Sequence, residues 1–433
     1  MLRSTKLLSA LLAFCFIFSA CSSGSNSSSD GKPADAVTKG EKVELSFMGW
    51  GTEQEREIYN KMLKNFEAKN PGYKVNYIFV TKDYDTKLKT MIAGNTEPDI
   101  FYVDATNVAQ YAKTGKLEVL DPYIKANPDL TANFVPGLLQ YGKVDGKQYT
   151  IPKDWQPYMM YINTDLFKAA NIPVPTGNWT MDEFVDISKK LTIVKDGKTT
   201  QYGIGLETWW GTWSVFAGNE GGAWFKDGKA NFSDPNVVKG LKRMYDLFVT
   251  NKAAPSPSAV QQAGMGQSQM FETGKVAMFP SGRWMVPTYR QSVSFNWTAV
   301  EMPKGSTRLN PIFSGTLAMG KDSKNKEAAA KLLGYILSKE GLQDVIGLGL
   351  SMPSYTTLFD DPMVSAPPAI EPFKATSNYL DTKVQYEATQ TGKFSELLDK
   401  FVTPELDKAF NGQQTIEEAV KHIDEGANSQ IFK

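Results

Sequence analysis

Residues 42–104 read KVELSFMGWGTEQEREIYNKMLKNFEAKNPGYKVNYIFVTKDYDTKLKTMIAGNTEPDIFYVD, and this stretch decides the fold of the chain. Polar and apolar residues alternate over 42–48, which predicts a strand. Thr52 and the acidic turn after it predict the start of a helix that runs to residue 69, where Asn70-Pro71-Gly72 ends it. The pattern repeats with a strand over 73–80, a helix over 83–93 and a strand over 99–103. This alternation predicts a parallel, doubly wound sheet.

Ligands of such sheets bind beyond the carboxyl ends of the strands. Trp50, the loop 81–84 and Asp104 lie at those ends. An aspartate at a strand end, such as Asp104, accepts hydrogen bonds from sugar hydroxyls without doing chemistry. Asp83-Tyr84-Asp85 is interpreted as a helix cap, because the glycine and the closing glutamate of a calcium loop are absent.

The rest of the chain predicts a second lobe. Short strands with turn residues between 144 and 163 indicate a first crossing between lobes. Further helices are predicted over 180–191, 235–251, 266–273 and 326–337, strands over 276–280 and 312–319, and a mostly helical segment from 371 onward.

The predicted organisation has five parts: a signal at 1–20, a tether at 21–40, a first α/β lobe at 41–155 completed by part of 312–370, a second α/β lobe at 156–311, and a helical segment at 371–433 that packs across the lobes. Several crossings between two lobes leave a cleft between them. A cleft of this kind is the usual place for a ligand.

The first residues have the order of an export signal. Arg3 and Lys6 precede an apolar run at 7–18, and Ser19-Ala20-Cys21 follows. The run is shorter than the ~20 apolar residues that span a bilayer, so we expect cleavage and a role outside the cytoplasm. The segment resembles a bacterial lipoprotein signal, which implies lipid attachment at Cys21. Phe18 departs from the usual aliphatic residue, and the alternative is an ordinary secretory signal with a chance cysteine.

Composition excludes several classes of protein. Lys and Arg total 47 and Asp and Glu total 47, so the basic surplus of a nucleic-acid-binding protein is missing. His422 is the only histidine, which argues against a multi-histidine zinc site or a Ser-His-Asp triad, and its polar helical surroundings predict a surface position. Cys15 lies in the signal, so the mature chain keeps one cysteine and forms no internal disulfide. No cofactor is expected.

Tryptophan is the most informative residue type for a ligand. A flat ring packs on the C–H face of a sugar, while sugar hydroxyls need polar side chains nearby. Most tryptophans belong to cores, but Trp209 and Trp210 cannot both point into a core from one helix face. Trp155 follows Lys153-Asp154 and Trp284 follows Arg283, which makes both candidates for ligand contact. The weaker candidates are Trp179, Trp224 and Trp297.

Several short motifs occur in a consistent order: FMGW at 47–50, PDIFYVD at 98–104, LDPY at 120–123, YTIPKDW at 149–155, YINTDLF at 161–167, FETGKVAM at 271–278 and SGRW at 281–284. In this order the chain resembles, over 41–433, the extracellular solute-binding proteins of carbohydrate-importing ABC transporters, a family that includes maltose-binding protein. The resemblance implies a periplasmic-binding-protein-like α/β fold, with two lobes, a hinge and an interlobe ligand cleft. It also implies a monomer with no catalytic residues.

The resemblance implies three partners: an oligosaccharide, the permease subunits of an ABC importer, and the membrane through the lipid on Cys21. An oligosaccharide is favoured over a monosaccharide because each added ring offers another face for stacking. The ligand-binding residues carried over by the motifs are Trp50, Asp104, Asp154, Trp155, Trp209, Trp210, Arg283, Trp284, Ser314, Gly315 and Tyr355.

Two alternatives share this sequence pattern. A secreted lipoprotein glycosidase would have the same aromatic cleft and would need two carboxylates about 5–10 Å apart. A sugar sensor that signals to a membrane kinase would differ only in its partner.

Overall fold

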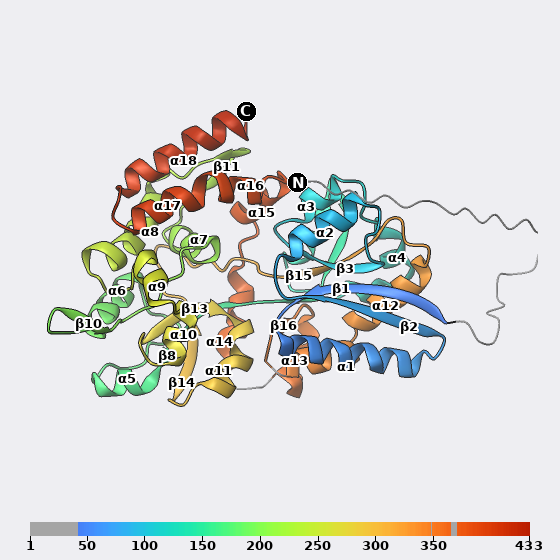
Figure 1. Ribbon diagram of the computed structural model, residues 1–433, viewed down its shortest axis with the longest axis horizontal. Coiled ribbons are helices and arrows are strands. Elements are labelled where there is room, and N and C mark those ends of the chain that lie inside the picture. The colour runs from blue at the N-terminus through green and yellow to red at the C-terminus, as the bar shows by residue number, and fades with distance from the viewer. Residues whose placement is uncertain (1–41, 348, 365–369) are drawn as a thin grey trace, which may run out of the picture. The chain divides into compact units, whose positions relative to one another are not determined.

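The computed structural model describes residues 42–347, 349–364 and 370–433 (Figure 1). The predicted signal, the lipid site Cys21 and the tether lie outside the described residues. Lys42–Lys433 form one compact unit. In the described part of this unit, no helix combines the length and the apolar character needed to cross a membrane.

The first lobe contains a five-stranded sheet in the order β2-β1-β3-β15-β6. The strands are β1 (Val43–Trp50), β2 (Tyr73–Val80), β3 (Ile100–Asp104), β15 (Gly315–Met319) and β6 (Thr150–Pro152). β1 runs parallel to β2 and β3, as predicted. β15 is antiparallel to both β3 and β6, so the sheet continues beyond the predicted parallel strands as a mixed sheet.

Helices cover both faces of this sheet. Phe47 packs in a core with the helices α1 (Glu53–Lys69) and α12 (Lys326–Leu337), whereas the next residue, Met48, packs with α2 (Tyr84–Ala93) and α3 (Val108–Ala112). This follows from the strand geometry, because successive side chains point to opposite faces. The two-sided burial explains why the strands of this lobe are rich in apolar residues.

The N-terminus of α1 is capped as the sequence predicts, whereas the N-terminus of α2 is not capped by a side chain. Thr52 caps α1 through a capping box with Glu55, whose Oε2 accepts a hydrogen bond of 2.6 Å from the Thr52 N–H. Asp83 occupies the N-cap position of α2, but it has a left-handed backbone with φ 55° and its side chain makes no capping hydrogen bond. Asp83 is therefore a cap by position alone.

The second lobe is built on the antiparallel sheet β13-β8-β14 (Figure 1, left). Its strands are β8 (Tyr158–Asn163), β13 (Met278–Gly282) and β14 (Trp297–Glu301). The helices of this lobe are α5 (Thr164–Ala169), α6 (Met181–Lys190), α7 (Trp210–Asn219), α8 (Pro235–Tyr245), α9 (Pro257–Ala263), α10 (Gln267–Glu272) and α11 (Val286–Ser292). The predicted helix over 235–251 is α8 followed by a π-helix at Asp246–Thr250.

The C-terminal helices α16 (Phe394–Leu397), α17 (Thr403–Phe410) and α18 (Ile416–Gln430) pack into the core of the second lobe through Leu397, Leu406 and Ile423. His422 lies on the exposed side of α18, as predicted, with Nδ1 3.0 Å from Glu405 Oε2.

The remaining α-helices and β-strands are short. They are the helices α4 (Asp121–Ala126), α13 (Lys339–Gly347), α14 (Glu371–Ala375) and α15 (Val384–Gln390), and the strands β4 (Lys143–Val144), β5 (Lys147–Gln148), β7 (Asp154–Trp155), β9 (Ile193–Lys195), β10 (Lys198–Gln201), β11 (Phe225–Lys226), β12 (Lys229–Ala230) and β16 (Met352–Pro353).

Two segments that connect the lobes lie side by side. β7 pairs antiparallel with β16, so Trp155 is the partner of Met352. Ser314, just before β15, donates a hydrogen bond of 2.6 Å from Oγ to the Asp154 carbonyl. These contacts hold the connecting segments together at the place where the strand ends of the first lobe meet the second lobe. The domain boundaries given above stay a prediction.

Candidate functional site

A cavity of about 480 Å³ opens between the strand ends of the first lobe and the aromatic residues of the second. We call it the cleft cavity. Its lining residues are Trp50, Gly51, Thr52, Glu55, Tyr59, Thr81, Tyr102, Asp104, Lys153, Asp154, Gln156, Trp209, Trp284, Met285, Thr288, Phe313, Ser314, Gly315 and Leu350. Its volume lies within the range of about 300–1,000 Å³ that small-molecule sites usually have.

The first lobe contributes residues from three neighbouring strand ends. Trp50 ends β1, Asp104 ends β3 and Gly315 begins β15. A Cβ atom on Gly315 would lie 3.3 Å from Trp50 Cζ2, so a glycine here gives the indole its room. The edge of the Trp50 ring system packs against Tyr84 and Tyr102, with ring centroids 4.9 and 5.1 Å apart. The ring is thereby held in place while remaining half-buried.

The second lobe contributes an aromatic wall. Trp284 lies in the 3₁₀ turn after β13, and Trp209 occupies the N-cap position of α7. Their ring centroids are 6.2 Å apart, and Phe313 packs 5.2 Å from Trp209 and 5.6 Å from Trp284. Both tryptophans are half-buried. The cavity therefore has aromatic surface on both lobes.

A buried ion pair lies at the base of the cavity. Lys153 Nζ bonds to Asp154 Oδ2 and lies over the rings of Tyr102 and Tyr59, 5.0 and 5.7 Å from their centroids. Burial alone would lower the pKa of Lys153, but the Asp154 carboxylate outweighs it and the pKa is raised. Lys153 is therefore a cation at neutral pH whose charge Asp154 balances.

Several hydrogen-bond acceptors line the cavity. Asp154 Oδ1 and Gln156 Oε1 are buried and have no partner among the described residues. Asp104 Oδ1 accepts a hydrogen bond of 2.9 Å from the Thr106 N–H. Burial raises the pKa of Asp104 and, against the hydrogen bonds from Thr52, that of Glu55. Buried acceptors without donors are costly, so the geometry suits a ligand that is rich in hydroxyl donors.

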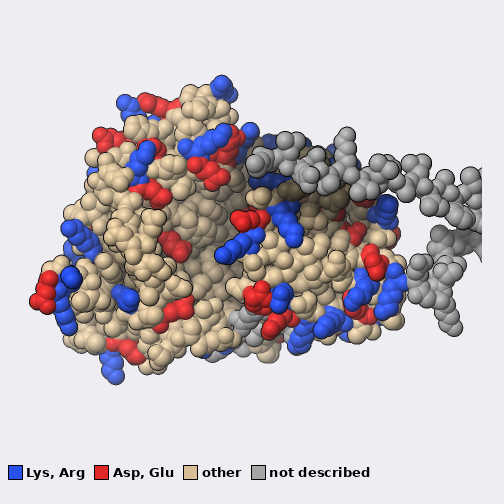
Figure 2. All heavy atoms as spheres, viewed as in Figure 1, with Lys and Arg blue, Asp and Glu red and all other residues tan. Residues whose placement is uncertain are grey.

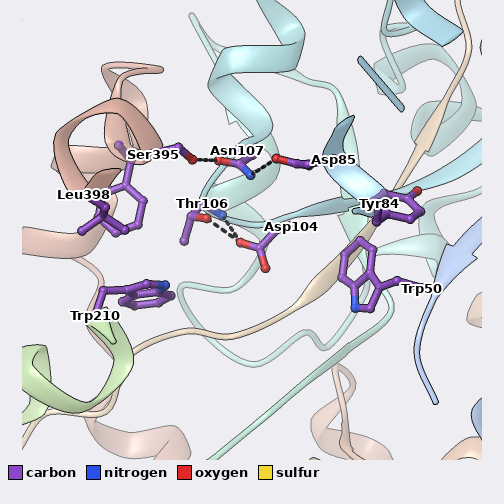
Figure 3. A pocket seen from close by; sticks show the side chains of 10 residues that line it. Trp50, Tyr84, Asp85, Asp104, Thr106, Asn107, Trp210, Ser395 and Leu398 are labelled. Carbon is purple, nitrogen blue, oxygen red and sulfur yellow. Dashed lines mark hydrogen bonds between the residues drawn. The ribbon is translucent and has the colours of Figure 1, made fainter. Parts of the chain in front are cut away.

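A second pocket of about 340 Å³ adjoins the cleft cavity and shares Trp50 and Asp104 with it. Figure 3 shows Trp50 and Trp210 on opposite sides of Asp104. At its rim Ser395 Oγ donates a hydrogen bond of 2.8 Å to Asn107 Oδ1, which joins the C-terminal helices to the first lobe.

The structure brings most of the predicted site residues together. Seven of them line the cleft cavity, namely Trp50, Asp104, Asp154, Trp209, Trp284, Ser314 and Gly315, and Trp210 lines the adjoining pocket. Their contact with a ligand stays a prediction.

Three predicted residues do not line these cavities. Trp155 is 1% exposed and donates a hydrogen bond of 3.1 Å from Nε1 to the Pro353 carbonyl. Arg283 is fully buried over the Phe373 ring, and burial lowers its pKa to about 10. Tyr355 donates a hydrogen bond of 3.0 Å to the Leu130 carbonyl and lines a separate pocket on the first lobe.

Other lining residues were not expected from the sequence. Glu55 and Tyr59 lie four residues apart on α1, directly after the strand end at Trp50, and this spacing is a signal that could have found them. Lys153 and Gln156 flank the predicted Asp154-Trp155 pair. Phe313 carries no recognisable signal. In the described ranges, no group of three or more His, Cys, Asp or Glu residues is placed to hold a metal ion.

Comparison with known proteins is consistent with this geometry. A family model described as "Bacterial extracellular solute-binding protein" matches residues 50–343. Diacetylchitobiose binding protein DasA of Streptomyces coelicolor is 25% identical over 348 residues, 77% of this chain and 78% of the relative. A putative binding protein of Brucella abortus is 27% identical over 295 residues, 65% of this chain and 69% of the relative.

Solved structures share the fold. An ABC substrate-binding protein of Listeria monocytogenes in complex with cycloalternan has a TM-score of 0.82 at 26% identity, over 91% of this chain and all of that one. Maltose-bound MalE3 of T. maritima has a TM-score of 0.74 at 20% identity, over 90% of this chain and all of that one.

Proposed function

Because the chain belongs to the family of bacterial extracellular solute-binding proteins, we propose that it captures an oligosaccharide in the cleft cavity and delivers it to the permease of an ABC importer. A carbohydrate ligand is supported by the similar proteins named for diacetylchitobiose or bound to cycloalternan. The function of this chain is then binding and release, and the sugar leaves with its glycosidic bonds intact.

The observation that carries this proposal is the pairing of aromatic rings with free acceptors in one cavity. Trp50 on one lobe and Trp284 on the other offer flat apolar faces. Asp154 Oδ1 offers an acceptor that no described protein group satisfies. A pyranose ring has an apolar C–H face and several hydroxyl donors, so it fits both features at once.

Charge favours a neutral sugar over an acidic one. Lys153 is the one basic residue among the described residues that line the cleft cavity, and Asp154 already balances it. Glu55 and Asp104 add negative charge. On the face seen in Figure 2, acidic and basic side chains are interspersed, so no large patch of one sign covers it. A uronate or phosphosugar would enter without a cation to pair with it.

The mechanism follows from a ligand that contacts both lobes. Such a ligand binds the closed arrangement more tightly than the open one, and it shifts the population toward the closed arrangement by that difference in affinity. The paired strands β7 and β16 and the segment before β15 are the connections about which the lobes would move.

We further propose that this receptor works at the membrane surface. Lipid attachment at Cys21 and the tether over 21–40 would hold the two lobes near the permease. One acyl chain anchors weakly, whereas the several chains of a lipoprotein hold firmly.

Uptake of labelled oligosaccharide by a strain that lacks the protein tests the proposal. We expect loss of uptake and its recovery on complementation. Retained uptake with lost induction of sugar-responsive genes would instead indicate a sensor, and cleavage of the sugar by the purified protein would indicate a glycosidase.

A further inference from the structure

Tyr84, the first residue of α2, packs against the ring of Trp50 (Figure 3). The two ring centroids are 4.9 Å apart and the ring planes meet at 74°, which is the edge-to-face arrangement that aromatic pairs prefer. Trp50 lines the cleft cavity and the adjoining pocket, whereas Tyr84 lines the adjoining pocket alone. Tyr84 therefore contacts a residue of the proposed sugar site from outside the cleft cavity.

The hydroxyl of Tyr84 joins the two strands that end in Trp50 and Asp104. It donates a hydrogen bond of 2.8 Å to the Tyr102 carbonyl on β3, and it lies 3.4 Å from the Met48 carbonyl on β1. Each of these carbonyls comes two residues before the last residue of its strand. Burial raises the pKa of Tyr84 well above its usual value, so the hydroxyl stays protonated and remains a donor.

The backbone directly before Tyr84 is strained. Asp83 has φ 55° and ψ 33°, a left-handed conformation that is uncommon outside glycine, although aspartate tolerates it better than most residues. No capping hydrogen bond from the Asp83 side chain offsets this strain. Strained residues persist where the surrounding structure holds them, and they gather at functional sites. At Asp83 the surrounding structure includes the next side chain, Tyr84, which is fixed to Trp50 and Tyr102.

This packing orders the Trp50 ring before a ligand arrives. Trp50 is half-buried, and its ring also packs against Tyr102, with centroids 5.1 Å apart. Immobilising a side chain on binding costs free energy, and a side chain that is already held in its bound orientation avoids most of that cost. The contact with Tyr84 thus has a consequence for affinity.

We infer that Tyr84 is a positioning residue, which holds Trp50 in the orientation that stacks on the ligand without being the stacking surface itself. The strained turn at Asp83 is what brings Tyr84 to this place. The inference rests on the proposed function, because it acts on a ring that the proposal assigns to the sugar. Loss of the Tyr84 side chain then weakens the ligand through Trp50 alone.

A double-mutant cycle between Tyr84 and Trp50 tests this inference. Its members are wild type, Tyr84→Leu, Trp50→Ala and the double variant, and Tyr84→Phe is added because it keeps the ring and removes only the hydroxyl. Tyr73→Leu is the matched control. Tyr73 lies at the other end of β2, is half-buried, and packs on Phe66 with ring centroids 5.8 Å apart.

Calorimetric titration of the full-length protein in a detergent without a sugar headgroup, with the oligosaccharide that binds wild type most tightly, gives the Kd. We expect Tyr84→Leu to weaken binding about tenfold, which is 1.4 kcal/mol, and Tyr84→Phe about threefold. In the Trp50→Ala background, Tyr84→Leu should change the Kd by less than twofold. Tyr73→Leu should leave the Kd within twofold of wild type.

A second measurement needs no ligand. Acrylamide quenching of tryptophan fluorescence should increase in Tyr84→Leu, because the Trp50 ring is then less well covered. The same substitution should not change the quenching when Trp50 is already alanine.

A loss of affinity in the Trp50→Ala background as large as in wild type would overturn the positioning role while leaving sugar capture intact. An unchanged Kd in Tyr84→Leu, or an equal loss in Tyr73→Leu, would do the same. Failure of every saccharide to bind wild type would overturn the proposed function and the positioning role with it. If Tyr84→Leu does not fold by circular dichroism, the same cycle with Tyr84→Phe decides the question.

Discussion

Asp104 and Gly315 are direct partners in the antiparallel pairing of β3 with β15. Residues far apart in the chain thus lie side by side where two inner strands of the first-lobe sheet end and begin, and both line the cleft cavity. Gly315 leaves room for the Trp50 ring, while Asp104 ends the strand next to β1. The carboxyl ends of β1 and β3 and the start of β15 therefore form one wall of the proposed sugar site.

Truncation of Trp284 should weaken sugar binding strongly. Trp284→Ala removes one of the aromatic faces on the second lobe, and truncating a central tryptophan commonly costs about 2 kcal/mol or more, roughly 30-fold in Kd. Titration calorimetry checks the affinity. Trp297→Ala is the matched control, because Trp297 is also half-buried but packs on Tyr161 and Tyr289 away from the cavity. Equal losses in both variants would contradict the assignment.

Trp155 should matter for stability and leave affinity unchanged. Trp155→Phe loses the hydrogen bond to the Pro353 carbonyl, which is worth about 1 kcal/mol. Urea denaturation should show this loss in the free energy of unfolding, and the Kd for the sugar should stay within twofold. A tenfold loss of affinity at unchanged stability would return Trp155 to the ligand site.

Breaking the Lys153–Asp154 pair should destabilise the folded protein. Asp154→Asn leaves the Lys153 ammonium buried among Tyr59 and Tyr102 without its counter-charge, and removal of one partner of a buried pair costs about 3–5 kcal/mol. Lys153→Met with Asp154→Asn should recover part of this loss, since both charges are then gone. Denaturant unfolding of wild type and of the two variants measures these losses. If Asp154→Asn alone were as stable as wild type, the ion pair would contribute little.

Glu405 should make the C-terminal helices sensitive to acid. Burial alone would raise the pKa of Glu405, but hydrogen bonds from Lys408, Gln414 and His422 outweigh it and bring the pKa from 4.5 to about 2. Since the pKa is lower in the folded state, this stabilisation is present above pH 4.5 and is lost as the pH falls toward 2.

The difference in the free energy of unfolding between wild type and Glu405→Gln should therefore become smaller as the pH falls from 4.5 toward 2. Thermal unfolding followed at several pH values measures this difference, and Glu425→Gln on the exposed surface of α18 is the control. A difference that stays constant with pH would contradict the lowered pKa.

The proposed lipid attachment at Cys21 gives a prediction for the N-terminus. Cys21→Ala should move the protein from the membrane fraction to the soluble extracytoplasmic fraction, because no acyl chain can then be attached. Cell fractionation followed by immunoblotting checks this, and metabolic labelling with a fatty acid should label wild type alone. A variant that stays in the membrane fraction would indicate another means of retention.

The sequence predicted those helices and strands in which apolar residues recur at a regular spacing. α1 and β2 follow the expected boundaries, and α12 does so because its apolar stripe and flanking residues mark both ends. The antiparallel direction of β15 could not be predicted. The residues of a strand do not indicate whether it pairs parallel or antiparallel with a strand far away in the chain. The mixed sheet is a property of the long-range pairing.

Two of the three predicted residues that do not line the cavities, Trp155 and Arg283, point away from them because of the local direction of the backbone. Asp154 and Trp155 are neighbours in a strand, so their side chains point to opposite sides, and only Asp154 reaches the cleft cavity. The neighbouring side chains of Arg283 and Trp284 also point in different directions. Arg283 is buried over the Phe373 ring, whereas Trp284 lines the cleft cavity. A motif identifies the neighbourhood of a site, but the side of the backbone that faces it depends on the assembled fold.

The most direct test of the central claim is a titration of the full-length protein, in a detergent without a sugar headgroup, against starch-derived, plant cell-wall and host oligosaccharides. Tryptophan fluorescence reports binding because Trp50, Trp209 and Trp284 line the cleft cavity, and chromatography of the ligand afterwards reports its integrity. We predict a saturable response to at least one neutral oligosaccharide, which is recovered intact, and loss of this response in Trp284→Ala. A ligand recovered in cleaved form, or no response to any member of the panel, would contradict it.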